Sequence, residues 1–223
     1  MSRYRNVIKI GGGVLLLGLA SGLSVAPDDT VGAAAKVGES LGGIDRSDQP
    51  AAGVFTPATI ERAGPEAERT VRVAIVTERE LLVDTDAFAE LVFDTANDER
   101  GWGGDGSVSF DLVIEEADLT IRLATPGTVD ELCAPLPTNG YTSCRIDDEI
   151  ILNVDRWSSA TPDFLDAGGT VEDYRTYLVN HETGHYLGYG HETSCRADGR
   201  APVMMQQTLD LGGCEPNGWP RIP

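Results

Sequence analysis

The sequence predicts an α+β domain in which helices pack on a twisted sheet. The chain has 223 residues, which is enough for one sizeable domain with its own core. Its 41% of hydrophobic and 24% of charged residues are typical of a globular protein, which excludes a disordered chain and a polytopic membrane protein. From about residue 70 onward, the hydrophobic pattern predicts a strand, a helix, two or three strands and a second helix.

The first part of this domain contains three predicted strands and one helix. Residues 70–77 are β-branched and apolar, which is typical of a buried strand. A helix follows, with Asp84 or Thr85 as its N-cap and apolar residues at helical spacing. Alternating apolar and polar residues then predict half-buried strands at 108–114 and 119–123.

The last two predicted elements are a strand at residues 149–154 and a long helix. Thr170 and Asp173 have the spacing of a capping box and would open this helix, which we expect to run to about Leu187. Gly184 inside it costs about 1 kcal/mol relative to alanine. Either a neighbour packs closely against this glycine or the cost is tolerated.

The first 26 residues predict export from the cytoplasm. They contain Arg3, Arg5 and Lys9 and no acidic residue, followed by the apolar run Ile10–Ala26. A basic start before an apolar run is typical of a signal peptide. The run is short for a membrane-spanning helix of roughly 20 residues. A cleaved signal peptide and an uncleaved signal anchor at residues 1–26 both stay open, and both place the rest of the chain outside the cytoplasm.

Residues 27–69 are predicted to form a flexible linker or stalk, and residues 70–223 the folded domain. The segment 27–69 is rich in Gly, Ala, Pro and Asp and has no sustained period. A pro-segment that folds onto the domain is the alternative.

The four cysteines predict two disulfide bonds, because their number is even and the chain is expected to be exported. The shortest loops pair Cys133 with Cys144 and Cys195 with Cys214, although three pairings are open in principle. A four-thiolate zinc site is disfavoured because the C-x2-C spacing is absent.

The net charge of −19 argues against one class of partner. So acidic a surface repels the phosphate backbone, and we therefore expect no nucleic-acid partner.

All three histidines of the chain fall in one eleven-residue window, HETGHYLGYGH. His181 and His185 are four residues apart, so on a helix they project from the same face. Glu182 lies beside them, where it reaches a water molecule held at the same site. Gly188 lets the helix end in a left-handed conformation, after which His191 can return as a third ligand.

Three neutral imidazoles leave one position of a tetrahedral zinc ion open, as a catalytic site requires. The ion would acidify a bound water molecule, and Glu182 would act as the general base that passes its proton to the leaving amine. Two alternatives stay open. The histidines bind nothing, or they hold zinc in a non-catalytic extracellular binding domain.

HETGHYLGYGH resembles the HExxHxxGxxH signature of the metzincin zinc proteases. These enzymes also have a tight turn with a methionine beneath the metal, and Pro-Val-Met-Met at residues 202–205 resembles it. Met204 is our choice for the turn position and Met205 the alternative; neither is expected to be a ligand. The wider sequence is similar to a family of secreted prokaryotic metzincin-like domains.

The resemblance implies a metzincin-like zincin with a twisted mixed sheet, two helices above the cleft and a short irregular C-terminal subdomain. It implies a secreted or surface-tethered monomer that uses Zn²⁺ to hydrolyse a peptide or protein substrate. An edge strand would bind the substrate main chain, and Asp118–Ala124 is our candidate, with a simple outer strand as the alternative. Too few residues follow Met204 for a long C-terminal helix, and a Cys195–Cys214 bridge would instead hold the methionine loop.

Overall fold

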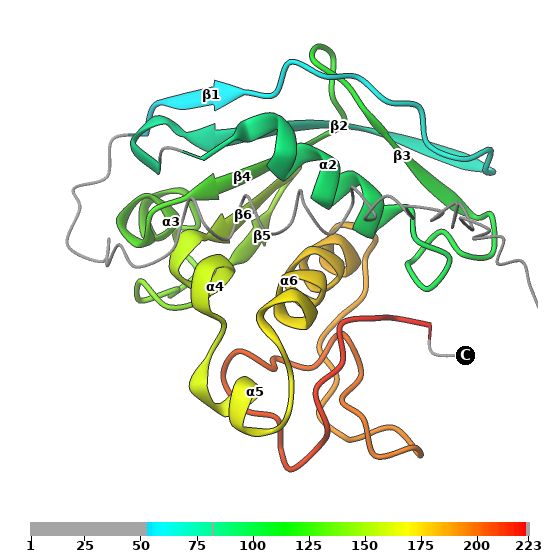
Figure 1. Ribbon diagram of the computed structural model, residues 1–223, viewed down its shortest axis with the longest axis vertical. Helices are drawn as coiled ribbons and strands as arrows, with labels where there is room; N and C mark the ends of the chain where they lie inside the picture. The colour runs from blue at the N-terminus through cyan, green and yellow to red at the C-terminus, as the bar shows by residue number, and fades with distance from the viewer. Residues whose placement is uncertain (1–52, 82, 222–223) are drawn as a thin grey trace, which may run out of the picture.

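In the part of the chain that the structure describes, a mixed sheet packs with two long helices above an irregular C-terminal part (Figure 1). The computed structural model describes residues 53–81 and 83–221. The α+β class predicted from the sequence is confirmed. The predicted segments 1–26 and most of 27–69 lie outside the described residues. Within the described part, no helix is both long enough and apolar enough to span a lipid bilayer.

The sheet has six strands in the order β1-β2-β4-β6-β5, with β3 paired to the first half of β2. Strands β2, β3, β4 and β6 run parallel, whereas β1 and β5 are antiparallel to their neighbours. The strands are β1 (Phe55–Pro57), β2 (Arg69–Glu78), β3 (Val108–Leu112), β4 (Leu119–Ala124), β5 (Cys144–Ile146) and β6 (Glu149–Asn153).

The four strands expected from periodicity are present, but one expectation about them is wrong. Strand β4 covers all but the first residue of the Asp118–Ala124 candidate for the edge strand, and it pairs with β2 on one side and β6 on the other. Alternation of apolar and polar residues reports that one face of a strand is buried; it says nothing about the neighbours in the sheet. Strands β1 and β5 lie at the two ends of this order, and β5 has only three residues, too few to show a period.

The folded region begins before residue 70. Strand β1 pairs with the end of β2, Ala58 is buried, and the Gly53 N–H donates a hydrogen bond to the Glu78 carboxylate at 3.2 Å. These residues fall inside the range predicted as linker. A three-residue strand flanked by glycine and proline residues carries no periodic signal, which explains why the sequence did not reveal it.

Both long helices begin where their caps predict. Helix α2 (Thr85–Ala96) is capped by Asp84, whose side chain accepts a hydrogen bond from the Ala87 N–H. Helix α6 (Val171–Tyr186) opens with the complete capping box of Thr170 and Asp173. The remaining helices are short and were not predicted: η1 (Arg79–Leu81), α3 (Pro126–Leu132), α4 (Val154–Ser159) and α5 (Pro162–Asp166).

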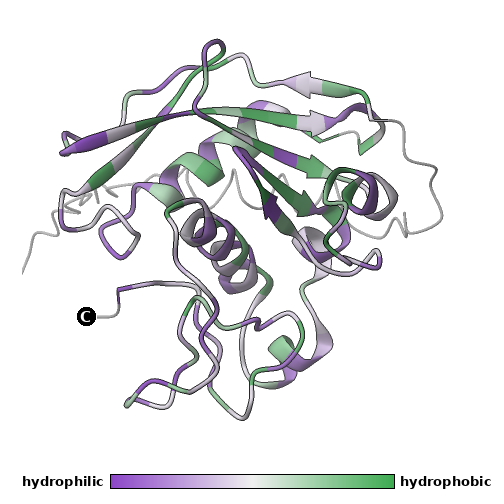
Figure 2. Ribbon diagram, turned by 180° about the vertical axis from the view of Figure 1, so that it is seen from behind, coloured by the Kyte–Doolittle hydropathy of each residue, from purple (hydrophilic) through white to green (hydrophobic). Residues whose placement is uncertain are grey.

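The main core lies between the sheet and the two long helices, which also contact one another. Hydrophobic residues concentrate on the strands and on the helix sides that face them (Figure 2). Trp157 and Phe88 meet edge to face in this core, with ring centroids 5.0 Å apart. The core therefore fixes α6, the helix that carries the histidine motif, against the sheet.

The C-terminal part, residues 187–221, contains no helix or extended strand among its described residues. The absence of a long C-terminal helix there agrees with the sequence analysis. The chain instead loops back twice beneath α6 (Figure 1), and a disulfide joins Cys195 to Cys214. Buried amide side chains from Gln207 and Asn217 bond to backbone groups of these loops.

Candidate metal centre

Helix α6 places two imidazoles on one face, one turn apart. His181 is buried and His185 is half-buried, and their rings are nearly perpendicular with centroids 4.7 Å apart. The Nε2 atoms of the two side chains lie 3.2 Å from each other. Two nitrogens bound to one tetrahedral zinc ion at about 2.0–2.1 Å would be about 3.3 Å apart, so the spacing fits a shared ion.

The end of α6 brings in the third histidine. Gly188 has a φ of +95°, and its N–H donates to the His185 carbonyl while the Tyr189 N–H donates to the Gly184 carbonyl. This is the Schellman arrangement, in which a left-handed glycine reverses the chain after the helix. The reversal puts the His191 Nε2 atom 3.0 Å from that of His185.

The tautomers of two histidines follow from their backbone partners. His181 Nδ1 lies 2.8 Å from the Val203 carbonyl oxygen, and His185 Nδ1 lies 2.9 Å from that of Tyr189. A carbonyl only accepts, so both Nδ1 atoms carry the proton and both Nε2 atoms present a lone pair. Two lone pairs at 3.2 Å repel unless a cation lies between them. Among the residues that the structure describes, this trio is the one histidine, cysteine or carboxylate group able to hold a metal ion.

The surroundings favour the neutral form of two of the imidazoles. Burial lowers the pKa of His181 to about 3; the hydrogen bond to the Val203 carbonyl opposes this shift, and the neighbouring His185 and His191 add to it. Burial also lowers the pKa of His191, with a second contribution from His185. The neutral imidazole is the form that binds metal, so these shifts favour metal binding by His181 and His191.

Glu182 supplies a carboxyl group to the same site. Its side chain is only 5% exposed, and burial raises its pKa to about 8. The carboxyl makes no hydrogen bond or ion pair with residues in the described ranges. A buried acid without a partner that lines the same hollow as the three histidines is available to bond a water molecule or a ligand.

A cleft of ≈ 520 Å³ opens in front of the histidines. Its floor is α6, with the Tyr177 ring next to that of His181. One wall is the loop before β5, with Leu136 and Thr138, and the other is the segment after the methionine turn, with Gln206 and Thr208. A hollow of this size can take several side chains of an extended peptide.

Residues 50–217 match the sequence profile of a family described as "Protein of unknown function (DUF3152)". The chain belongs to this family. Searches of curated proteins and of solved structures found no match. Because the family's description carries no activity, the geometry of the DUF3152 domain is what bears on function.

Met204 packs directly beneath the histidine helix of this DUF3152 domain. The Met205 N–H donates to the Pro202 carbonyl at 2.9 Å, which closes a turn. Met204 is 1% exposed, and its sulfur occupies the space that a Cβ on Gly184 would need. A neighbour therefore does pack closely against Gly184, and the absence of a side chain there leaves room for Met204. Met205 instead belongs to a small cluster in the C-terminal part.

Trp102 is a site residue that the sequence analysis missed. Its ring lies 2.7 Å from the position of a Cβ on Gly184, its Nε1 donates to the Asn180 carbonyl, and it stacks on Tyr189 at 4.3 Å. A tryptophan in an otherwise small, glycine-rich loop was the available signal, since nothing in such a loop could bury it locally.

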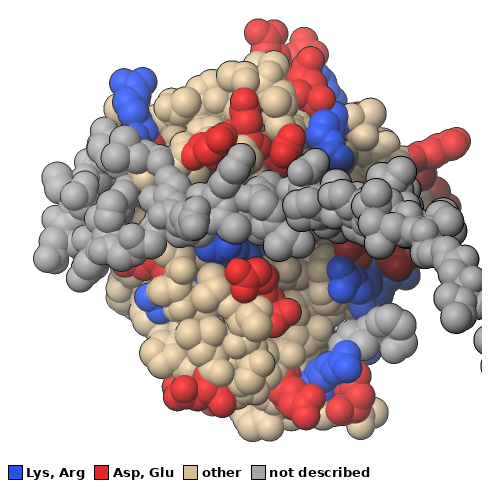
Figure 3. All heavy atoms as spheres, viewed as in Figure 1, with Lys and Arg blue, Asp and Glu red and all other residues tan. Residues whose placement is uncertain are grey.

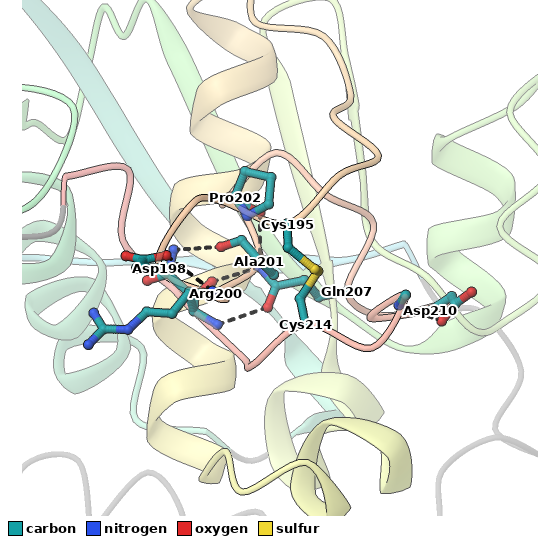
Figure 4. Close-up of a disulfide and its surroundings, with 10 residues drawn as sticks. Cys195, Asp198, Arg200, Ala201, Pro202, Gln207, Asp210 and Cys214 are labelled. Carbon is teal, nitrogen blue, oxygen red and sulfur yellow. Dashed lines mark hydrogen bonds between the residues drawn. A yellow bond between two sulfur atoms is a disulfide. The ribbon is translucent and has the colours of Figure 1, made fainter.

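Each wall of the cleft is tied by one of the two disulfides, which form the two local pairs favoured by loop length. Cys133–Cys144 closes the loop before β5, and its residues are separated by 11 positions. Cys195–Cys214, separated by 19 positions, closes the loops beneath α6 (Figure 4). Disulfides are typical of extracellular proteins.

Two buried tyrosines on α6 hold the second wall. The Tyr177 hydroxyl donates to the Met205 carbonyl at 3.2 Å, and the Tyr174 hydroxyl bonds to that of Thr208 at 2.8 Å. Burial raises the pKa of both tyrosines. Both therefore remain protonated and act as fixed hydrogen-bonding groups between the helix and the methionine loop.

Proposed function

We propose that this chain is a zinc-dependent endopeptidase, secreted or tethered at the cell surface. The observation that carries the proposal is the convergence of three Nε2 atoms beside the unpaired carboxyl of Glu182 in one cleft. The HETGHYLGYGH motif and the methionine turn support it through their resemblance to the metzincins. The prediction of a monomer without nucleic-acid partners belongs to the same proposal.

The donor set favours zinc among the common metals. Three imidazoles without a carboxylate suit zinc better than magnesium or calcium, which prefer oxygen. Hydrogen bonds from Nδ1 to backbone carbonyls orient His181 and His185, as is usual for zinc ligands. A zinc ion bound there would polarise a substrate carbonyl and lower the pKa of water toward about 7.

Glu182 would carry the proton during the reaction. It would accept a proton from a water molecule in the cleft and pass it to the amine that leaves when the peptide bond breaks. Its buried position matters because an acid with a pKa nearer neutrality can both accept and release a proton. A nearby dication would favour the carboxylate form at the start of the cycle.

A peptide substrate suits the open edge of the sheet. Strand β5 pairs with β6 on one side only, and residues 143–145 line the cleft that contains the histidines. An extended peptide could add to this edge through main-chain hydrogen bonds, which hold it without regard to sequence. Strand β5 thus takes the role that the sequence analysis gave to residues 118–124.

The test is the Glu182→Gln variant of the exported chain, with Glu192→Gln as its matched control. Glu192 is an exposed acid just after the third histidine. We expect wild type and Glu192→Gln to digest a peptide library and Glu182→Gln to lose at least about 10³-fold in rate. Metal analysis should find one zinc per chain in all three. Zinc without any digestion by wild type would favour a binding domain with structural zinc, and equal digestion by Glu182→Gln would reject its role.

A further inference from the structure

Arg145 occupies the middle of the edge strand β5 and lines the cleft together with the three histidines. It is the one lysine or arginine among the residues that line this cleft. Its neighbours on the walls are mostly neutral, with apolar Leu136 and Leu209 exposed at the rims. A positive charge therefore stands in an otherwise neutral wall of the site.

The guanidinium of Arg145 forms no hydrogen bond, ion pair or ring contact within the described ranges. Its Nε atom is buried and has no hydrogen-bond partner. Arg122, two strands away in the same sheet, also has a buried Nε without a partner, but the rest of its guanidinium pairs with Glu149 and covers the Phe55 ring. The buried Nε of Arg145 has therefore lost hydration without gaining a hydrogen bond, and the guanidinium as a whole is free to bind a ligand.

The chain has many acidic residues that could have formed an ion pair with Arg145. The sequence has 36 acidic residues for 17 basic ones, and Figure 3 shows acidic side chains in several separate groups with basic ones beside them. Glu182, the acid of the cleft, is not that partner. No hydrogen bond or ion pair joins its carboxyl to the guanidinium of Arg145, although both side chains line the same cleft.

We infer that Arg145 binds a carboxylate of the substrate. This inference rests on the proposed peptidase function. A planar guanidinium forms two parallel hydrogen bonds to a carboxylate, and the partly dry wall strengthens them. The carboxylate belongs either to an Asp or Glu side chain at a fixed distance from the cleaved bond or to the free C-terminus of a short peptide. The first makes the protein an endopeptidase with acidic preference; the second confines cleavage to chain ends.

The experiment digests a library of decapeptides with the zinc-loaded full chain and identifies the cut sites by mass spectrometry. One half of the library has free C-termini and the other half amidated C-termini. An acidic side-chain site predicts Asp or Glu enriched at one position in both halves. A terminal-carboxylate site predicts cuts at a constant distance from the end, in the free half only. Cuts with neither preference would overturn the inference.

Two variants assign the preference to Arg145. Arg145→Gln should reduce the rate on preferred peptides by about 10- to 100-fold while leaving the rate on non-preferred peptides within threefold. Arg145→Glu should shift the enrichment to Lys or Arg at the same position. Arg200→Gln removes the same charge outside the cleft, from a guanidinium that points away from the disulfide in Figure 4, and should change neither. Unaltered selectivity in Arg145→Glu would refute the assignment.

A binding measurement separates this inference from the peptidase proposal. The zinc-loaded Glu182→Gln variant is titrated with fluorescein-labelled peptide pools that contain Glu or Gln at each position. We expect the Glu pool, or the free-acid form of the Gln pool, to bind at least tenfold tighter, and the extra Arg145→Gln change to remove that difference. If wild type cleaves nothing but this difference in affinity persists, the peptidase proposal fails and the carboxylate-binding role of Arg145 is supported. Equal binding of all pools would reject that role.

Discussion

The two halves of the molecule are held together by different forces. The sheet and its long helices share a continuous apolar core that includes Trp157 and Phe88. The C-terminal part has a cluster of only four buried apolar residues, Ala201, Met205, Leu211 and Cys214. Gln207 and Asn217 compensate, because their amides bond to backbone groups that no regular element satisfies.

The candidate metal centre lies where the two halves meet. His181 and His185 come from the upper helix, whereas His191 and the carbonyl that orients His181 come from the lower part. A bound ion would therefore join a rigid framework to a loop region that has few apolar contacts of its own. The C-terminal part should therefore depend on the metal, the disulfide and the amide hydrogen bonds for its stability, and the sheet with its long helices should not.

The largest effect concerns Glu182 in the metal-free protein. Its folded-state pKa of about 8 exceeds the ordinary 4.5, so between these values the folded chain keeps a proton that the unfolded chain releases. Stability must then fall as pH rises from about 4.5 to 8, by up to about 1.4 kcal/mol per pH unit. The depressed pKa of His181 acts in the opposite direction below 6.5, but it is present in both proteins compared.

Denaturant unfolding of chelator-treated wild type and Glu182→Gln across this range checks the prediction. The wild type should lose about 3 kcal/mol relative to the variant between pH 5 and 8. Parallel profiles would mean that the carboxyl is hydrated and that the cleft is wetter than described.

The second effect separates the two disulfides. The Cys195→Ser/Cys214→Ser double variant should lose about 3 kcal/mol of stability and bind zinc at least tenfold more weakly, because this bridge closes the loops that carry the lower half of the site. The Cys133→Ser/Cys144→Ser variant should lose a similar amount of stability but keep its zinc affinity within threefold. Competition with a zinc chelator measures both; unchanged affinity in the first variant would contradict the comparison.

The sequence could reveal the histidine site because its three histidines lie within eleven residues, and two of them are one helical turn apart. The long helices were readable for the same reason, since Asp84 and the Thr170–Asp173 pair act on adjacent backbone. Arg145 could not be found in this way. Its importance comes from the position of β5 at the edge of the sheet, which depends on pairing with distant residues.

The methionine turn was only partly predictable from the sequence. Pro202 to Met205 indicated a turn, but only packing distinguishes the two methionines. The sulfur of Met204 occupies the space that a side chain on Gly184 would need. Trp102 was missed since it comes from a loop about 80 positions before the helix that it contacts. Local sequence patterns identified the three histidines, whereas packing between distant segments determines which residues support them.

The smallest effect concerns the amide network. Gln207→Ala should cost about 2 kcal/mol, because it leaves the buried N–H and carbonyl of Asn217 without their partner. The exposed neighbour Gln206 provides the control, and Gln206→Ala should change stability by less than about 0.5 kcal/mol. Hydrogen exchange should show faster exchange of amides in residues 187–221 and unchanged protection in β2 and β4. Loss of protection throughout the sheet would show that the two halves unfold as one.

The central claim is that three imidazoles grip one zinc ion at the junction of the two halves. X-ray absorption at the zinc edge, on protein purified without added metal and with its zinc content measured, tests it most directly. The account predicts one zinc per chain with three imidazole nitrogens at about 2.0–2.1 Å and a remaining oxygen ligand. A chain that contains no stoichiometric metal, or a spectrum that stays the same in His185→Ala, would contradict it.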